Sequence, residues 1–182
     1  TGTLSAPLGR VALAAGEVIT VGISGNNQIA IAIDASVAKQ VLDSQGNPIT
    51  TQITNTGTIT AESGQVTFTA QAANDLFDLA INQQGVVRAD TLVAGKNGVI
   101  ELVASGPIQS QGTLSAKGGT VSVSSGKDIT IASTLETSGN TTFKANRDLK
   151  VEANLTTDSG NLILTADAEL NGEGRFLQSQ GT

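Results

Sequence analysis

Gly112-Thr113-Leu114 opens a stretch, residues 112–181, in which one pattern returns three times at a spacing of about 21 residues. In the first pass, Leu114 is followed by Val121-Ser122-Val123 and then by Ile129-Thr130-Ile131. Self-similarity at a fixed period near 20 residues is typical of a solenoid, in which each repeat buries its apolar face against its neighbours. This stretch therefore predicts a stacked, repetitive fold.

Four apolar positions recur once per repeat, and each set of recurring positions is called a column here. The first column holds Leu4, Ile59, Val87, Leu114, Leu135, Leu155 and Phe176. The second holds Val11, Val66, Ile100, Val121, Thr141 and Leu162, and the third holds Leu13, Phe68, Leu102, Val123, Phe143 and Leu164. The fourth holds Ile19, Ile108, Ile129, Leu149 and Leu170, with no member in the repeat of Phe68. Residues two apart share one face of a strand. The columns predict an all-β, right-handed parallel β-helix with about 21 residues and three short strands per coil.

Glycine also recurs at fixed places. Gly64, Gly98, Gly119, Gly139 and Gly160 each lie two residues before the second column. Glycine at a recurring corner supplies left-handed backbone or allows close approach between coils. These positions predict the bends between strands.

Departures from the period predict insertions in a single β-helix segment that spans residues 1–182. Insertion 24–56 contains the alternating run 29–33, which predicts an extra strand, and residues 34–42, whose apolar spacing predicts a short helix. Insertion 72–83 also has helical spacing, and insertion 90–97 reads as a loop. Residues 98–182 are predicted to form regular coils.

The composition and charge of the chain exclude several kinds of partner and cofactor. The chain contains no His, Cys, Trp, Tyr or Met, and its formal charge is −6. Nucleic acid needs a basic footprint, so it is not an expected partner. No apolar run reaches 18 residues, so no membrane insertion is expected. No thiol or imidazole is present to hold a cofactor, and we expect none.

Stacked acids are the most suggestive chemical feature. Asp128, Asp148 and Glu169 are predicted to share one position in successive coils, beside a basic pair, Lys127 and Arg147. Acids about 5 Å apart can share a cation, so these three are weak candidates for a metal site. The alternative interpretation is a row of solvated corner residues whose charges partly neutralise each other. We expect no metal and no catalytic residue, because general acid–base chemistry needs carboxylates paired in a pocket.

Two stretches carry a resemblance to a known family. One runs from Gly57-Thr-Ile-Thr-Ala-Glu-Ser-Gly64 to Ala72-Ala-Asn-Asp75 and continues with Ile81-Asn-Gln-Gln-Gly-Val-Val-Arg-Ala89; the other is Gly9-Arg-Val-Ala-Leu-Ala-Ala-Gly-Glu17. Both resemble large bacterial exoproteins of the filamentous-haemagglutinin type. The resemblance implies a right-handed β-helix that is exported by two-partner secretion through an outer-membrane transporter. It further implies a secreted or cell-surface location. No Asn-Pro-Asn motif of the N-terminal secretion domain is found, which implies an internal segment.

Together these features predict a structural rod or spacer in a bacterial adhesin or fibre-like exoprotein. One alternative is a module that binds a receptor or glycan through residues 24–56 or 72–97. A polysaccharide lyase or hydrolase is the third alternative. Residues 178–182 repeat residues 109–113, so we expect as partners either further coils of a longer parent chain or copies stacked end to end.

Overall fold

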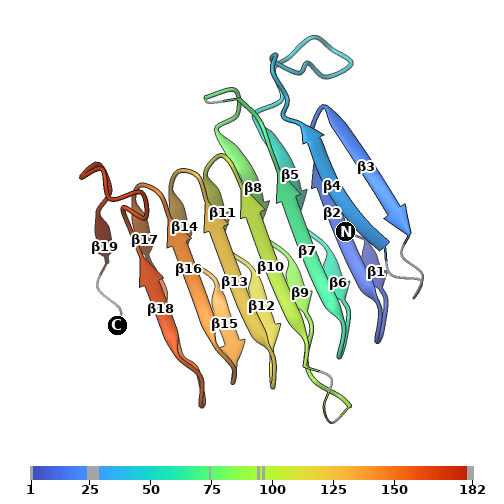
Figure 1. The fold of residues 1–182 in the computed structure, drawn as a ribbon, viewed down its shortest axis with the longest axis vertical. Coiled ribbons are helices and arrows are strands. Elements are labelled where there is room, and N and C mark those ends of the chain that lie inside the picture. Colours follow the sequence, from blue (N-terminus) through green and yellow to red (C-terminus); the bar gives the residue numbers. More distant parts are fainter. Residues whose placement is uncertain (1, 24–28, 74, 94, 96, 180–182) are drawn as a thin grey trace.

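The computed structural model describes residues 2–23, 29–73, 75–93, 95 and 97–179. Within these residues the chain is all-β, with no helix. Its strands form three parallel sheets and one antiparallel hairpin (Figure 1). Successive strands of each sheet stack side by side along one direction, as they do in a β-solenoid.

The three parallel sheets are numbered here in the order in which the chain first enters them. Sheet 1 consists of β1 (Thr3–Ser5), β6 (Thr58–Thr60), β9 (Val86–Arg88), β12 (Thr113–Ala116) and β15 (Thr134–Thr137). Sheet 2 consists of β2 (Arg10–Ala15), β7 (Gln65–Ala70), β10 (Val99–Ala104), β13 (Thr120–Ser125), β16 (Thr141–Ala145) and β18 (Leu162–Thr165). Sheet 3 consists of β5 (Thr51–Asn55), β8 (Leu79–Gln83), β11 (Ile108–Ser110), β14 (Ile129–Ile131), β17 (Leu149–Val151) and β19 (Phe176–Gln178). The hairpin pairs β3 (Val18–Ile23) with β4 (Ile29–Ala35).

The pairing register follows the first three columns. In sheet 1, Leu114 pairs with Val87 on one side and with Leu135 on the other. In sheet 2, Val123 pairs with Leu102 and Phe143. Side chains of one column, nearly all of them apolar, therefore lie next to one another from coil to coil.

These columns form the core. Leu114, Val121, Val123, Ile129, Leu135, Phe143 and Leu149 are all buried. Leu155, Leu162 and Leu164, which lie towards the C-terminal end of the stack, are partly buried against the same core. Outward-facing neighbours in the same strands are polar or small, so burial alternates along β13 and β16 as a half-buried strand requires.

The fourth column was predicted wrongly at both ends. Ile19 lies in β3 and pairs with Ile33 of the hairpin. Leu170 has a φ of 57° and is 88% exposed. Phe176, predicted in the first column, pairs with Leu149 in sheet 3 and takes the place assigned to Leu170.

At the other end of sheet 3, the missing members of the fourth column are Ile53 and Ile81. Ile81 pairs with Ile53 on one side and with Ile108 on the other. Both residues lie inside stretches that were predicted to be insertions, and both are buried. Insertions 24–56 and 72–83 therefore return to the stack in their last residues.

The two predicted helices are absent. Over residues 34–42, β4 continues to Ala35, Val37 bridges to Ala72, and Leu42 bridges to Pro48. In 72–83, the last five residues form β8. A helix of about ten residues is marginal by itself, whereas a strand between β5 and β11 satisfies its backbone on both sides and completes a core column. Residues 24–28 and 74 of these insertions lie outside the described residues.

The predicted corner glycines lie where the backbones of neighbouring coils leave no room for a Cβ atom. A Cβ placed on Gly64, Gly119, Gly139 or Gly160 would overlap the carbonyl oxygen of the glycine one coil earlier, and one on Gly98 would overlap that of Ala89. Coils therefore approach too closely at this corner for any side chain. Residues 90–97 connect β9 to β10, with residues 94 and 96 outside the described set.

Candidate functional site

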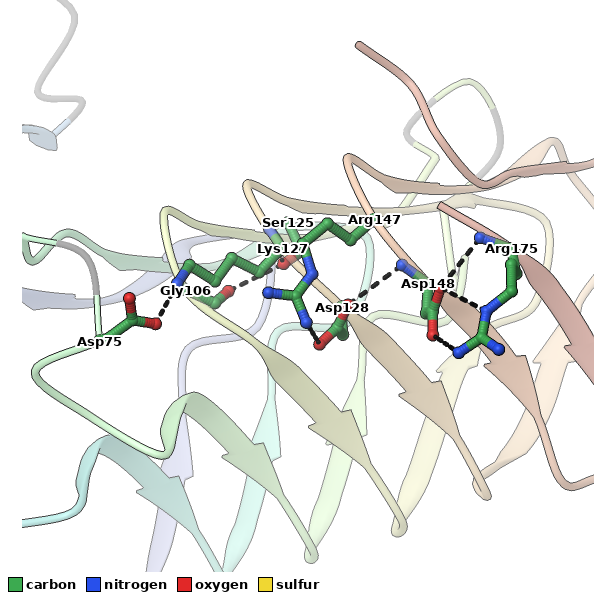
Figure 2. A network of polar contacts seen from close by, with 8 residues as sticks. All are labelled: Asp75, Gly106, Ser125, Lys127, Asp128, Arg147, Asp148 and Arg175. Carbon is green, nitrogen blue, oxygen red and sulfur yellow. Dashed lines mark hydrogen bonds and ion pairs between the residues drawn. The ribbon is translucent and has the colours of Figure 1, made fainter. Parts of the chain in front are cut away.

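The stacked acids lie at the corner that leads into sheet 3, and they alternate with arginines (Figure 2). Asp128 accepts a hydrogen bond of 3.0 Å from the backbone N of Asp148 and is ion-paired with Arg147 at 3.0 Å. Asp148 repeats the arrangement one coil later: it accepts 2.9 Å bonds from the backbone N and from the guanidinium of Arg175. Each carboxylate thus holds the corner of the next coil, and the set is called the corner ladder here.

Glu169 does not belong to the corner ladder. Arg175 precedes Phe176 as Asp148 precedes Leu149, so an arginine occupies the position that was predicted for this acid. Glu169 is exposed and contacts Asn146 instead. The corner ladder therefore brings together two of the three candidate ligands, and each of those two is neutralised by a guanidinium. Across the described ranges, no three His, Cys, Asp or Glu side chains lie close enough to hold a metal ion.

A second polar cluster, which the sequence analysis missed, lies on sheet 1. The buried hydroxyl of Ser115 lies 2.6 Å from Asp90 and 3.3 Å from Glu136. Lys117 is ion-paired with Glu136 at 3.0 Å. The hydrogen bond from Lys117 lowers the pKa of Glu136, and the pKa of Lys117 is raised in return. A general acid needs the opposite shift, so Glu136 is not suited to proton donation. Asp90 accepts hydrogen bonds from Ser115 and from the backbone N of Lys117 and so holds the loop after β9 against the next coil.

Insertion 72–83 contacts the stack next to the corner ladder, at Lys127, the residue before Asp128. Lys127, whose side chain is only 13% exposed, is ion-paired with Asp75, and this contact lowers the pKa of Asp75. Phe77 is half-buried and lines a small cavity of about 10 Å³ together with Gln52 and Lys127. The connection from β7 to β8 therefore packs against the stack, and little of Phe77 is left for a partner.

The β3–β4 hairpin leaves more surface open. Ile19, Val21 and Ile23 pair with Ile33, Ile31 and Ile29, so six β-branched side chains share one face of the ribbon. Val21 is 60% exposed and Ile23 is 76% exposed. Alternation in 29–33 predicted the strand β4, but the matching alternation of β3 was hidden because Ile19 was assigned to the core.

Comparison with models of protein families, with curated proteins and with solved structures finds no match for this chain. In the part of the chain that the structure describes, no helix is long and apolar enough to cross a membrane.

The corner ladder predicts a pH dependence of stability. The hydrogen bond from Arg175 holds the pKa of Asp148 below its ordinary value of 3.8. A carboxyl with a lowered folded pKa stabilises the fold above its unfolded value, and this stabilisation is lost as the pH falls through the folded pKa. We expect Asp148→Asn to cost about 1 kcal/mol at pH 7, or roughly 2–4 °C in melting temperature, and this cost to disappear as the pH falls through the folded pKa of Asp148. Melting curves between pH 2 and 7 measure this, with the exposed Asp158→Asn as control. An equal loss at all pH values would contradict the assignment.

Proposed function

We propose that this chain is a structural rod: a stiff spacer segment of a secreted or cell-surface bacterial exoprotein. The observation that carries the proposal is the unbroken register of sheets 2 and 3, with six strands each, over continuous and largely apolar columns. Parallel backbone pairing on both sides of each inner strand resists bending along the stack. The rod is a right-handed β-helix with a coil of about 21 residues.

The charged groups support a mechanical role. The corner ladder and the Ser115 cluster join residues of successive coils, and their carboxylates are held by arginine, lysine or backbone N–H groups. Such contacts stiffen corners. The resemblance to filamentous-haemagglutinin exoproteins supports export by two-partner secretion through an outer-membrane transporter and a role in an adhesin or surface fibre.

The proposed rod has a definite length along the stack, and this length can be measured. Strands in a sheet are about 4.8 Å apart, so the outermost strands of sheet 2 are separated by roughly 24 Å. When one copy is placed between an outer-membrane anchor and an epitope, we expect the epitope to rise by about that distance, as read by energy transfer to a lipid dye. A flexible Gly-Ser linker of equal residue number is the control. An epitope as mobile as that on the linker would contradict the spacer function, and reproducible cleavage of any polysaccharide would favour the enzyme.

A binding module that acts through the hairpin is the second candidate, favoured by the exposure of Val21 and Ile23. The hairpin can be removed cleanly, because the backbone N of Glu17 bonds to the carbonyl of Ala35 at 2.8 Å across its base. We expect a chain in which residues 18–34 are replaced by a short Gly-Ser link to melt within a few degrees of the parent. A glycan panel should show no binding before or after this change. Binding by the parent that disappears without the hairpin would favour the module.

A further inference from the structure

The two ends of the stack present unfinished faces. At the N-terminal face each parallel sheet ends on an edge strand, β1, β2 or β5. Beside β1 and β2 is an open hollow of about 450 Å³, whose walls include Leu4 and Val11 on one side and Val21, Ile29 and Ile31 of the hairpin on the other. Leu4 is 48% exposed although it heads the first column. The hairpin lies beside β2, joined to it by a 2.8 Å bond from the guanidinium of Arg10 to the carbonyl of Ile29, and within the described chain β4 pairs only with β3.

At the C-terminal face the sheets end on β15, β18 and β19. A second open hollow, of about 430 Å³, is lined there by Leu155, Leu162, Leu164 and Phe176. Phe176 is 48% exposed. These four side chains end the apolar columns on this side, as Leu4, Val11 and Leu13 end them on the other.

The two faces match in spacing. Val11 and Leu13 follow Leu4 by seven and nine residues, and Leu162 and Leu164 follow Leu155 by the same intervals. Within the stack, residues with this spacing already pair in register: Ile59, Val66 and Phe68 of β6 and β7 lie beside Leu4, Val11 and Leu13 of β1 and β2. A coil that carried Leu155, Leu162 and Leu164 would therefore place them over Leu4, Val11 and Leu13.

The two faces differ in charge. Residues 2–23 and 29–35 contain one base, Arg10, and two acids, Glu17 and Asp34, so the N-terminal face is close to neutral. Residues 151–175 contain five acids, namely Glu152, Asp158, Asp167, Glu169 and Glu173, and one base, Arg175. Repulsion between like charges therefore disfavours contact between two C-terminal faces, and contact of a C-terminal face with an N-terminal face avoids it.

We propose that the C-terminal face of one copy docks on the N-terminal face of a second copy, so that the parallel sheets continue from one molecule into the next. β18 then lies beside β2, under the hairpin, and the apolar columns continue across the junction. Such a head-to-tail contact leaves one free face at each end and therefore propagates into a linear filament. The proposal depends neither on export nor on the family resemblance.

The test uses the complete 182-residue chain in sedimentation velocity and light scattering over a range of concentrations. We expect the mean mass to rise above 18.3 kDa as concentration rises.

Leu4→Lys blocks only the N-terminal face, and Phe176→Lys blocks only the C-terminal face. Both side chains are half exposed, so the fold should survive, as circular dichroism would verify. Each variant alone should stay monomeric. An equimolar mixture should form dimers and stop at twice the monomer mass. Leu92→Lys, at a site that is 70% exposed on the loop after β9, is the control and should associate like the parent.

Several outcomes would overturn the proposal. An unmodified chain that keeps the monomer mass at every concentration would show that its end faces do not bind each other. Association that survives in both Leu4→Lys and Phe176→Lys but is lost in Val21→Lys would assign it to the edge of the hairpin. A mixture of the two end variants that remains monomeric would exclude a head-to-tail contact.

Discussion

Val123→Asp is expected to abolish the cooperative fold of this chain. Val123 is fully buried in the third column, between Leu102 of one coil and Phe143 of the next. Neither Leu102 nor Phe143 can pair with a carboxylate, and burying an unpaired charge costs far more than burying a polar group that finds a partner. The loss should be about 4 kcal/mol or more, a large part of the stability of an ordinary domain.

Circular dichroism and thermal melting of the purified variant measure this effect. Ser124→Asp is the matched control, because Ser124 is the next residue of β13 and faces outward. Leu149→Asp, in the fourth column, should fail in the same way as Val123→Asp. If either core variant melted like the parent while Ser124→Asp also did, the register described here would be wrong.

Gly119→Ala is expected to have the second-largest effect. Coils approach so closely at this corner that a Cβ on Gly119 would overlap the carbonyl oxygen of Gly98. Both groups are backbone, so no side chain can rotate away and two coils must separate locally. We expect a loss of roughly 3 kcal/mol, at the upper end of the cost of overpacking, and a lower melting temperature.

The control for the corner is Gly22→Ala in β3. The nearest atom to a Cβ there is the carbonyl oxygen of Ala30, at an ordinary contact distance of 3.9 Å. This change should leave the melting temperature almost unaltered. Equal stability of Gly119→Ala and Gly22→Ala would show that the corner can open without cost, against the account of stacked glycines.

The sequence predicted the first three columns well, apart from Phe176, because the second and third columns are always two residues apart and the first column lies six or seven residues before the second in every coil except that of Val87. It failed in the fourth column, because the number of residues that separate this column from the third column varies between coils. Counting backward from the first column would have found the buried members: Ile53 and Ile81 each lie six residues before Ile59 and Val87. Counting forward from Leu164 led to Leu170 instead, because the loop of residues 166–175 lengthens that coil.

Helical spacing misled in both insertions for a physical reason. Apolar residues three and four apart can equally serve a chain that touches the stack at separate points, as Val37 does at Ala72. Ten residues gain little as an isolated helix, while an edge strand nearby offers backbone partners. Local periodicity cannot reveal these backbone partners, because the strand that supplies them lies one coil away in the sequence.

The candidate site was predictable only in part. The alternation of Asp128 and Asp148 with Arg147 could be read from the repeat, but Arg175 could not, since its place depends on the loop that precedes it. The Ser115 cluster had a signal that went unused: Arg88, Ser115 and Glu136 follow the first column by one residue each. A buried amide pair was also missed, in which Asn55 donates to Gln83 at 2.7 Å inside sheet 3.

The central claim is that successive coils stack in register, and distances between spin labels test it most directly. Ala12, Thr67, Glu101, Ser122, Thr142 and Ile163 form one rank across sheet 2. The chain has no cysteine, so labels can be attached at Ala12→Cys together with Thr142→Cys or Ile163→Cys. At about 4.8 Å per strand, the account predicts mean separations near 19 Å and 24 Å, with narrow distributions. Equal, reversed or broad distances would contradict it.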